Sequence, residues 1–85
     1  MLPENSTKLE QLVSYVAKSL VDNPEEVSVR FLEGDQTSVV EIHAATEDMG
    51  KIIGRQGRTI RALRTVVMAA SAKLQKRVSV ELMDG

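Results

Sequence analysis

The spacing of apolar residues changes several times along this 85-residue chain, and this pattern restricts the fold more than any other feature. Apolar side chains recur every three or four positions over roughly 7–21 and again over 58–75, which predicts an amphipathic helix in each segment. They alternate with polar side chains in 27–31, 38–44 and 78–82, which predicts three strands with one buried face each. The two helical stripes comprise Leu9, Leu12, Val13, Val16 and Leu20, then Ile60, Leu63, Val67, Ala70 and Leu74.

Local sequence signals predict where the first three elements begin and end. Thr7 and Glu10 have the spacing of a capping box, so the first helix is expected to begin with Thr7 as its N-cap. The Asp22-Asn23-Pro24 sequence is expected to end that helix, because proline disfavours helical backbone in the residue before it. Residues 33–36 contain a glycine and join two alternating segments, so the first two strands are expected to form an antiparallel hairpin.

A short helix is expected over about 47–53 with Thr46 as its cap, and residues 54–57 separate it from the long helix that follows. The expected order is therefore α-β-β-α-α-β, in a single domain spanning residues 1–85. The second and third strands are joined through two helices, and a crossover of this kind favours parallel pairing. Together these features predict an α+β domain, in which a three-stranded mixed sheet carries three helices on one face and meets water on the other.

Composition excludes several classes of function. The chain has no cysteine and one histidine, so disulfides, thiolate metal sites and a cysteine nucleophile are excluded, and a histidine-based site is nearly excluded. No pair of carboxylates or nucleophile–base pair stands out, so we expect neither an enzyme nor a metal or cofactor site. The sequence has no signal-peptide pattern and no apolar run long enough for a membrane span, so a cytoplasmic protein without membrane association is expected.

The net charge of −1 conceals two oppositely charged segments. Residues 1–48 carry three basic and ten acidic side chains, whereas residues 49–80 carry eight basic and no acidic ones. Because salt screens fields beyond about 10 Å, this local asymmetry matters more than the total charge. The basic segment is therefore a candidate surface for a polyanion, and it contains three of the five glycines.

Those glycines lie in G-K-I-I-G-R-Q-G-R, residues 50–58. A Walker A loop would need glycine where Ile52 stands and lysine where Arg58 stands, and the G-x-G-x-x-G loop needs a different spacing after a strand. What remains is G-x-x-G between two helices. This segment resembles the signature of KH domains, I-[IV]-G-x-x-G-x-x-I, and the α-β-β-α-α-β order resembles the type II, bacterial form of that fold. The likeness covers essentially the whole chain, which is most similar to the stand-alone bacterial KH-domain RNA-binding proteins of the KhpA-like (YlqC-like) family.

The resemblance implies that the loop clamps the backbone of single-stranded RNA. Glycine lacks a Cβ, so a nucleic-acid backbone approaches closely, and the helix after the loop directs free N–H groups and its positive dipole end toward an anion. Arginine and lysine side chains are expected to contact phosphates, Gln56 to donate to a phosphate or sugar, and isoleucines, Ile60 among them, to form an apolar floor for bases. The expected RNA-binding residues are Lys51, Ile52, Ile53, Gly54, Arg55, Gln56, Gly57, Arg58 and Arg61.

Less specific interpretations of the same residues stay open. A G-x-x-G segment also occurs as a simple turn between helices, a row of arginines also occurs as a solvated helix face, and Ile53 and Ile60 also fit a core. The chain has two aromatic residues, Tyr15 and Phe31, and both lie outside the loop. Base stacking on aromatic side chains is therefore not expected, and we expect broad sequence tolerance instead.

A protein-interaction module is the alternative function. The second long helix is apolar nearly all round over residues 66–70, which predicts a second buried surface and self-association as a homodimer. The family resemblance also implies a heterodimer with a KhpB (Jag-like) protein. It further implies RNA-chaperone or post-transcriptional roles that affect cell shape, through elongation and division, in some bacteria.

Overall fold

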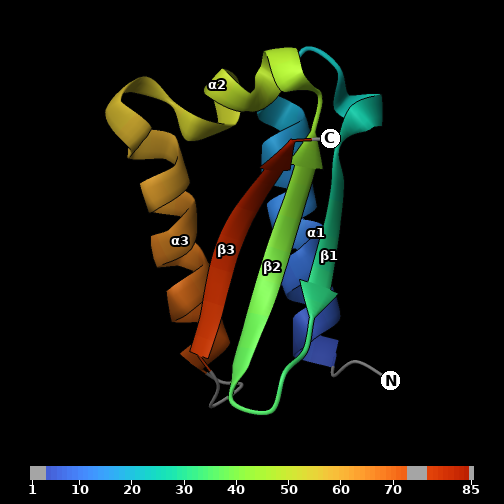
Figure 1. The fold of residues 1–85 in the computed structure, drawn as a ribbon. Helices are drawn as coiled ribbons and strands as arrows, with labels where there is room; N and C mark the ends of the chain where they lie inside the picture. Colours follow the sequence, from blue (N-terminus) through green and yellow to red (C-terminus); the bar gives the residue numbers. More distant parts are fainter. Residues whose placement is uncertain (1–3, 73–76, 85) are drawn as a thin grey trace.

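The computed structural model describes residues 4–72 and 77–84, with the backbone alone for 4–7. Three helices and three strands follow one another in the predicted α-β-β-α-α-β order (Figure 1). They are α1 (Glu4–Leu20), β1 (Ser28–Leu32), β2 (Thr37–Ala44), α2 (Met49–Ile53), α3 (Arg58–Ser71) and β3 (Arg77–Asp84). Single 3-10 turns, η1 (Pro24–Glu26), η2 (Thr46–Asp48) and η3 (Arg55–Gly57), lie at three of the connections. The order confirms the predicted α+β class.

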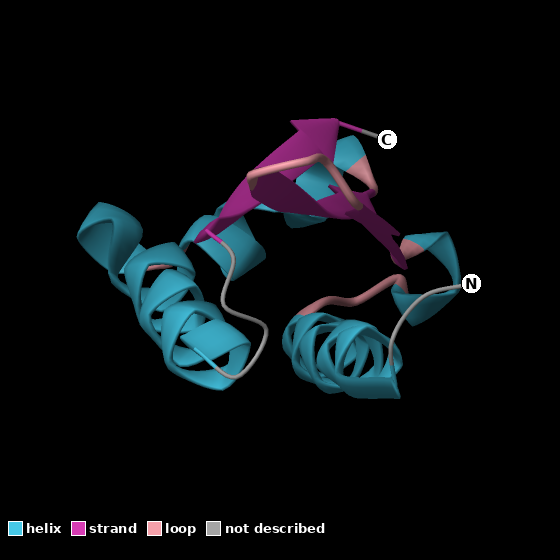
Figure 2. Ribbon diagram, turned by 90° about the horizontal axis from the view of Figure 1, so that it is seen from below, coloured by secondary structure: helices cyan, strands magenta, loops and turns pink. Residues whose placement is uncertain are grey.

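The sheet has the strand order β1-β2-β3, with β2 antiparallel to β1 and parallel to β3. Its register aligns Phe31 with Val40 and Val40 with Val80, so one buried apolar row crosses all three strands. The helices cover one face of this sheet, and α1 and α3 pack against each other beneath it (Figure 2). The mixed pairing and the single covered face were both predicted from the alternation of the strands and the helical crossover.

The core lies between the sheet and the two long helices. Val40, Ile42 and Ala44 of β2 are fully buried, as expected for the central strand. On α1 the buried stripe is Leu9, Val13 and Ala17, whereas the predicted stripe members Leu12 and Leu20 are exposed at its edge. On α3 the buried residues are Ile60, Leu63, Val67 and Ser71.

Ser71 takes the place in the α3 stripe that was predicted for Ala70, which is exposed. A step of four residues from Val67 keeps the side chain on the buried face, whereas a step of three moves it aside. The last predicted member of the stripe, Leu74, and the predicted end of the helix near residue 75 lie outside the described residues.

Two predicted helix caps are wrong. The first helix begins at Glu4, one turn earlier than predicted, so Thr7 lies inside the helix and is not its N-cap. Thr46 is the first residue of η2 and caps no helix; its hydroxyl donates instead to Asp84 Oδ1 at 2.6 Å. The sheet register explains the second case, because it sets Ala44 beside Asp84 and brings that carboxylate close to Thr46.

The open face of the sheet is polar along its centre. Glu41 and His43 lie there on β2, and His43 Nε2 is 3.2 Å from Glu41 Oε1. Within residues 4–72 and 77–84, no helix is both long and apolar enough to cross a membrane.

Candidate nucleic-acid interface

Gly54 ends α2 in a backbone conformation that favours glycine, with φ 78° and ψ 171°. Its N–H donates to the Gly50 carbonyl at 2.9 Å, which closes the helix. A Cβ added at this position would lie 2.7 Å from Thr59 Cβ and 2.9 Å from the Thr59 backbone nitrogen. Gly54 is therefore needed for both its conformation and the close packing of the loop against the start of α3.

The surroundings of Gly57 differ from those of Gly54. It is left-handed, with φ 73° and ψ 15°, and its N–H donates to the Gly54 carbonyl at 3.1 Å. A Cβ added here would have no heavy atom within 4 Å, so the backbone at Gly57 borders open space. Gln56, just before it, is also left-handed (φ 56°, ψ 26°), an unfavourable conformation for a residue with a side chain. The outer side of the loop is thus open to the approach of another molecule at Gly57, whereas Gly54 faces inward.

Arg55 and Arg58 are exposed on this open loop. Within the described part of the chain, neither side chain makes a hydrogen bond or an ion pair. Arg58 is the first residue of α3, and its N–H donates to the Arg55 carbonyl of η3, whereas the next N–H groups of the first turn have no partner within the helix. Two unpaired guanidinium groups and a helix N-terminus therefore share one edge of the molecule.

Arg61, also exposed, is turned back onto the loop. Its Nη2 donates to the Gln56 carbonyl at 2.7 Å, and its Nε donates to the Gly57 carbonyl at 3.3 Å. The sequence placed Arg61 on the phosphate-facing side of the helix, and these contacts with the loop backbone were not expected.

Lys51 lies in α2, before the loop, and forms ion pairs with two carboxylates. Its Nζ lies 3.1 Å from Asp22 Oδ2 and 3.5 Å from Asp48 Oδ1. The hydrogen bond and charge of Asp22, together with the charge of Asp48, raise the pKa of Lys51 above its ordinary value. Lys51 therefore holds α2 against the segment that follows α1.

Asp48, the last residue of η2, is fully buried. It accepts hydrogen bonds from the Asn23 backbone nitrogen (3.0 Å), the Asn23 side-chain amide (3.0 Å) and the Asp22 backbone nitrogen (3.3 Å). Burial raises the pKa of the Asp48 carboxyl, but the hydrogen bonds from Asn23 and Asp22 and the charge of Lys51 outweigh it, and the pKa lies below its ordinary value. The only sequence signal for this cluster is the spacing of three between Asp48 and Lys51.

The fold buries two of the three isoleucines that were expected to form an apolar floor for bases, and it leaves the third partly exposed. Ile52 is fully buried, and Ile60 is nearly so, which makes both part of the core. Their side chains present almost no surface to a ligand, so the expected contact of Ile52 and Ile60 with bases stays a prediction that their burial does not support. Ile53 is 40% exposed and remains available.

A hollow of about 360 Å³ lies between α3 and the edge strand β3. It is lined by Arg64, Met68, Val78, Ser79 and Val80. Arg64 lies about two turns along α3 from the loop.

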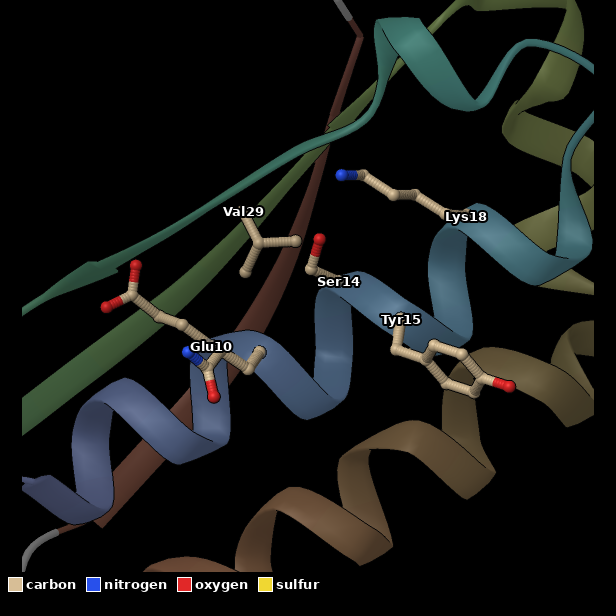
Figure 3. A pocket seen from close by; sticks show the side chains of 6 residues that line it. Glu10, Ser14, Tyr15, Lys18 and Val29 are labelled. Carbon is tan, nitrogen blue, oxygen red and sulfur yellow. The ribbon is translucent and has the colours of Figure 1, made fainter.

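A second hollow lies at the opposite edge of the sheet, between α1 and β1 (Figure 3). Glu10 and Lys18 mark its two ends, Val29 faces it from the strand, and Tyr15 is largely exposed beside it. It brings together one acidic and one basic side chain, so it lacks the cation cluster found around the loop. Within the described ranges, no group of three or more His, Asp or Glu side chains is arranged to hold a metal ion.

The architecture defined by these features, with G-x-x-G joining two helices in an α-β-β-α-α-β domain, is that of a type II KH domain. A family model described as KhpA/KhpB, KH domain, matches residues 10–82. The chain belongs to this family of KH domains.

Curated relatives match the chain over most of its length. RNA-binding protein KhpA of Clostridium acetobutylicum is 51% identical over 75 residues, covering 88% of this chain and 100% of the relative. KhpA of Caldanaerobacter subterraneus subsp. tengcongensis is 51% identical over 73 residues, covering 86% and 97%. KhpA of Borreliella burgdorferi is 42% identical over 74 residues, covering 87% and 90%.

Solved structures of the protein Era are similar in fold. Aquifex aeolicus Era bound to GDP.AlF4- superposes with a TM-score of 0.57 at 22% identity, covering 99% of this chain and 32% of Era. Era in complex with MgGDPNP and a segment of 16S ribosomal RNA gives the same TM-score, covering 98% of this chain and 31% of Era. The chain spans about a third of Era, and the likeness shows the fold alone.

Proposed function

We propose that this protein binds single-stranded RNA at the loop Gly54–Gly57, without catalysis. The observation that carries the proposal is the arrangement at the loop's outer side, where open backbone at Gly57 adjoins the unpaired side chains of Arg55 and Arg58. A phosphodiester backbone matches such a surface, because closely spaced phosphates are strong acceptors that carry charge. The relatives named RNA-binding protein KhpA support RNA as the ligand.

The phosphates are held by charge and by backbone donors. Arg55 and Arg58 contact successive phosphates, and the N–H groups that follow Arg58 in the first turn of α3 add directional hydrogen bonds. Gln56 presents an amide at the tip of the loop that is able to donate to a phosphate or a sugar hydroxyl. These contacts carry no base identity, so they supply affinity and leave the sequence unspecified.

The bases then lie along Ile53 and the hollow between α3 and β3. Met68, Val78 and Val80 give that hollow an apolar lining, and Arg64 stands at its margin. Both aromatic residues are elsewhere, Phe31 in the core and Tyr15 on α1. Without aromatic stacking, the expected result is modest affinity and weak sequence preference, which fits an RNA chaperone or a post-transcriptional regulator in the cytoplasm.

Self-association is the second part of the proposal. A wholly apolar hollow of about 200 Å³ lies between α1 and α3, with Leu12 and Val66 partly exposed at its rim. A homodimer formed over this surface, or a heterodimer with a KhpB (Jag-like) protein, would cover it and present two loops to one RNA, which raises affinity by avidity. The competing function, a protein-interaction module that binds little RNA, rests on the same apolar surface.

Fluorescence anisotropy of a labelled single-stranded RNA separates these functions. The native chain is compared with the Arg55→Asp/Gln56→Asp variant, which keeps both glycines and reverses the charge at the loop tip. RNA binding that is lost in a variant with unchanged circular dichroism supports the loop as the site. Equal behaviour of the two chains would favour the protein-interaction module, and sedimentation equilibrium of the same samples reports whether the chain is a dimer.

A further inference from the structure

The four basic side chains nearest the loop fall into two pairs. The charged groups of Arg55 and Arg58 make no hydrogen bond or ion pair with a described residue, whereas those of Lys51 and Arg61 are bonded to the protein. We infer that Lys51 and Arg61 are positioning residues, which hold the loop in the shape that binds RNA. Arg55 and Arg58 then make the phosphate contacts at the loop. This inference rests on the proposed function and assigns distinct roles to cations that the sequence treated alike.

Arg61 stabilises the part of the loop with the least favourable backbone. Its guanidinium spans the carbonyls of Gln56 and Gly57, which are the two consecutive left-handed residues. A left-handed residue with a side chain relaxes readily unless its surroundings hold it. Because a trans peptide directs its C=O and N–H to opposite sides, fixing the Gly57 carbonyl also fixes the direction of the Arg58 N–H. That N–H donates to the Arg55 carbonyl, so Arg61 helps to hold the single turn η3 that forms the loop.

Lys51 stabilises the loop from the other side, through α2. That helix has five residues and leads directly into Gly54, so its position sets where the loop starts. The Lys51 ammonium bridges exposed Asp22 and buried Asp48, and Asp48 is itself hydrogen-bonded to Asn23. These contacts fasten α2 to the segment after α1.

The two pairs differ in what a phosphate would have to displace. A phosphate that bound Arg61 would compete with two backbone carbonyls, and one that bound Lys51 would compete with two carboxylates. Arg55 and Arg58 have no hydrogen bond or ion pair to a described residue that a phosphate would displace. The cations that neutralise phosphate at the loop are then these two arginines, and this number is measurable from the salt dependence of binding.

The test uses four single variants, Arg61→Gln, Lys51→Gln, Arg58→Gln and Arg55→Gln. Each is titrated against a short fluorescein-labelled single-stranded RNA of mixed sequence over a salt series, and its amide hydrogen exchange at residues 54–58 is measured without RNA. We expect Arg58→Gln and Arg55→Gln each to flatten the salt slope by about 0.7 and to leave loop exchange unchanged. Arg61→Gln and Lys51→Gln are expected to speed loop exchange and to weaken binding several-fold at fixed salt, with the native slope.

Asp22→Asn tests the role of Lys51 by changing one of its carboxylate partners and leaving Lys51 itself intact. The Asp22 side chain is 77% exposed, so the change removes the bridge with little effect on packing. If Lys51 is a positioning residue, loop exchange speeds up and the slope stays native; a phosphate ligand released from Asp22 would instead steepen the slope. The inference is overturned if Arg61→Gln or Lys51→Gln flattens the slope as Arg58→Gln does, or leaves loop exchange unchanged. If the native chain itself fails to bind the RNA, the proposed function fails and this inference with it.

Discussion

The buried carboxylate of Asp48 accepts two hydrogen bonds of 3.0 Å from Asn23, one from the backbone and one from the side-chain amide. Asn23 follows α1 and Asp48 precedes α2, so the pair joins the two segments that lead to and from the hairpin. A buried charge without partners would be strongly unfavourable, and here each carboxylate oxygen has at least one N–H donor. This pair holds the segment before β1 against the start of α2, and α2 leads directly into the loop.

Replacing Asp48 with asparagine is expected to destabilise the fold clearly. The new amide would turn an N–H donor toward the donors of Asn23 and Asp22, leaving buried groups unpaired. Thermal unfolding by circular dichroism measures the effect, with exposed Glu47→Gln as the matched control one residue away. A melting temperature for Asp48→Asn equal to that of the control would contradict the structure.

The free energy of unfolding is expected to fall in acid because of the same carboxyl. The pKa of Asp48 is lower in the folded chain than its ordinary value, so its stabilising contribution is complete above about pH 4. That contribution is lost as the pH falls through the lowered value, where the folded state must take up the proton. Urea denaturation over a pH series checks this, and Asp48→Asn should show a smaller loss of stability on acidification than the native chain. Parallel curves for the two chains would rule out Asp48 as the source.

Gly54→Ala and Gly57→Ala are expected to differ in cost. At Gly57 the added methyl group enters open space, and the cost of the left-handed conformation alone is about 1–2 kcal/mol. At Gly54 the methyl group also meets the backbone nitrogen of Thr59 at 2.9 Å, which the loop relieves only by moving. Urea denaturation of both variants gives the comparison. A Gly54→Ala chain no less stable than Gly57→Ala would show that the contact with Thr59 is easily relaxed.

Ile52→Ala and Ile53→Ala separate folding from binding. Ile52 is fully buried, so its truncation is expected to lower the free energy of unfolding by about 2–5 kcal/mol. Ile53 is partly exposed beside the loop, so its truncation should cost much less stability and should weaken RNA binding. Denaturation and anisotropy on the two variants measure both quantities. Equal loss of stability at the two positions would be inconsistent with the burial described here.

The order of the elements was predictable because hydrophobic spacing reports each element locally. The loop was predictable as well, since glycine spacing and the run of basic residues are both visible in nine consecutive positions of the sequence, 50–58. The ends of the helices were harder to predict from the sequence. Thr7 and Thr46 have cap-like neighbours, but a helix extends past the first and a carboxylate from β3 binds the second. At Thr46 a tertiary contact overrides the local signal.

The roles of individual side chains at the site were the least predictable part. The apolar run Ile52-Ile53 does not indicate which residue faces inward, because a five-residue helix has too few turns to define a stripe. The partners of Asp48 lie 25 and 26 positions away, so no spacing rule connects them. Lys51 and Arg61 are predicted phosphate contacts, but charge alone does not show that their side chains are already bonded within the protein.

The most direct test of RNA binding at the loop is an NMR titration of the isotopically labelled chain with a short single-stranded RNA. We predict that amide shifts concentrate at residues 54–59, continue along the α3 side facing β3, and reach Val78–Val80. Only small changes are expected on the open face of the sheet around His43 and in the hollow between α1 and β1. Shifts confined to those two regions, or no shifts at saturating RNA, would contradict this prediction.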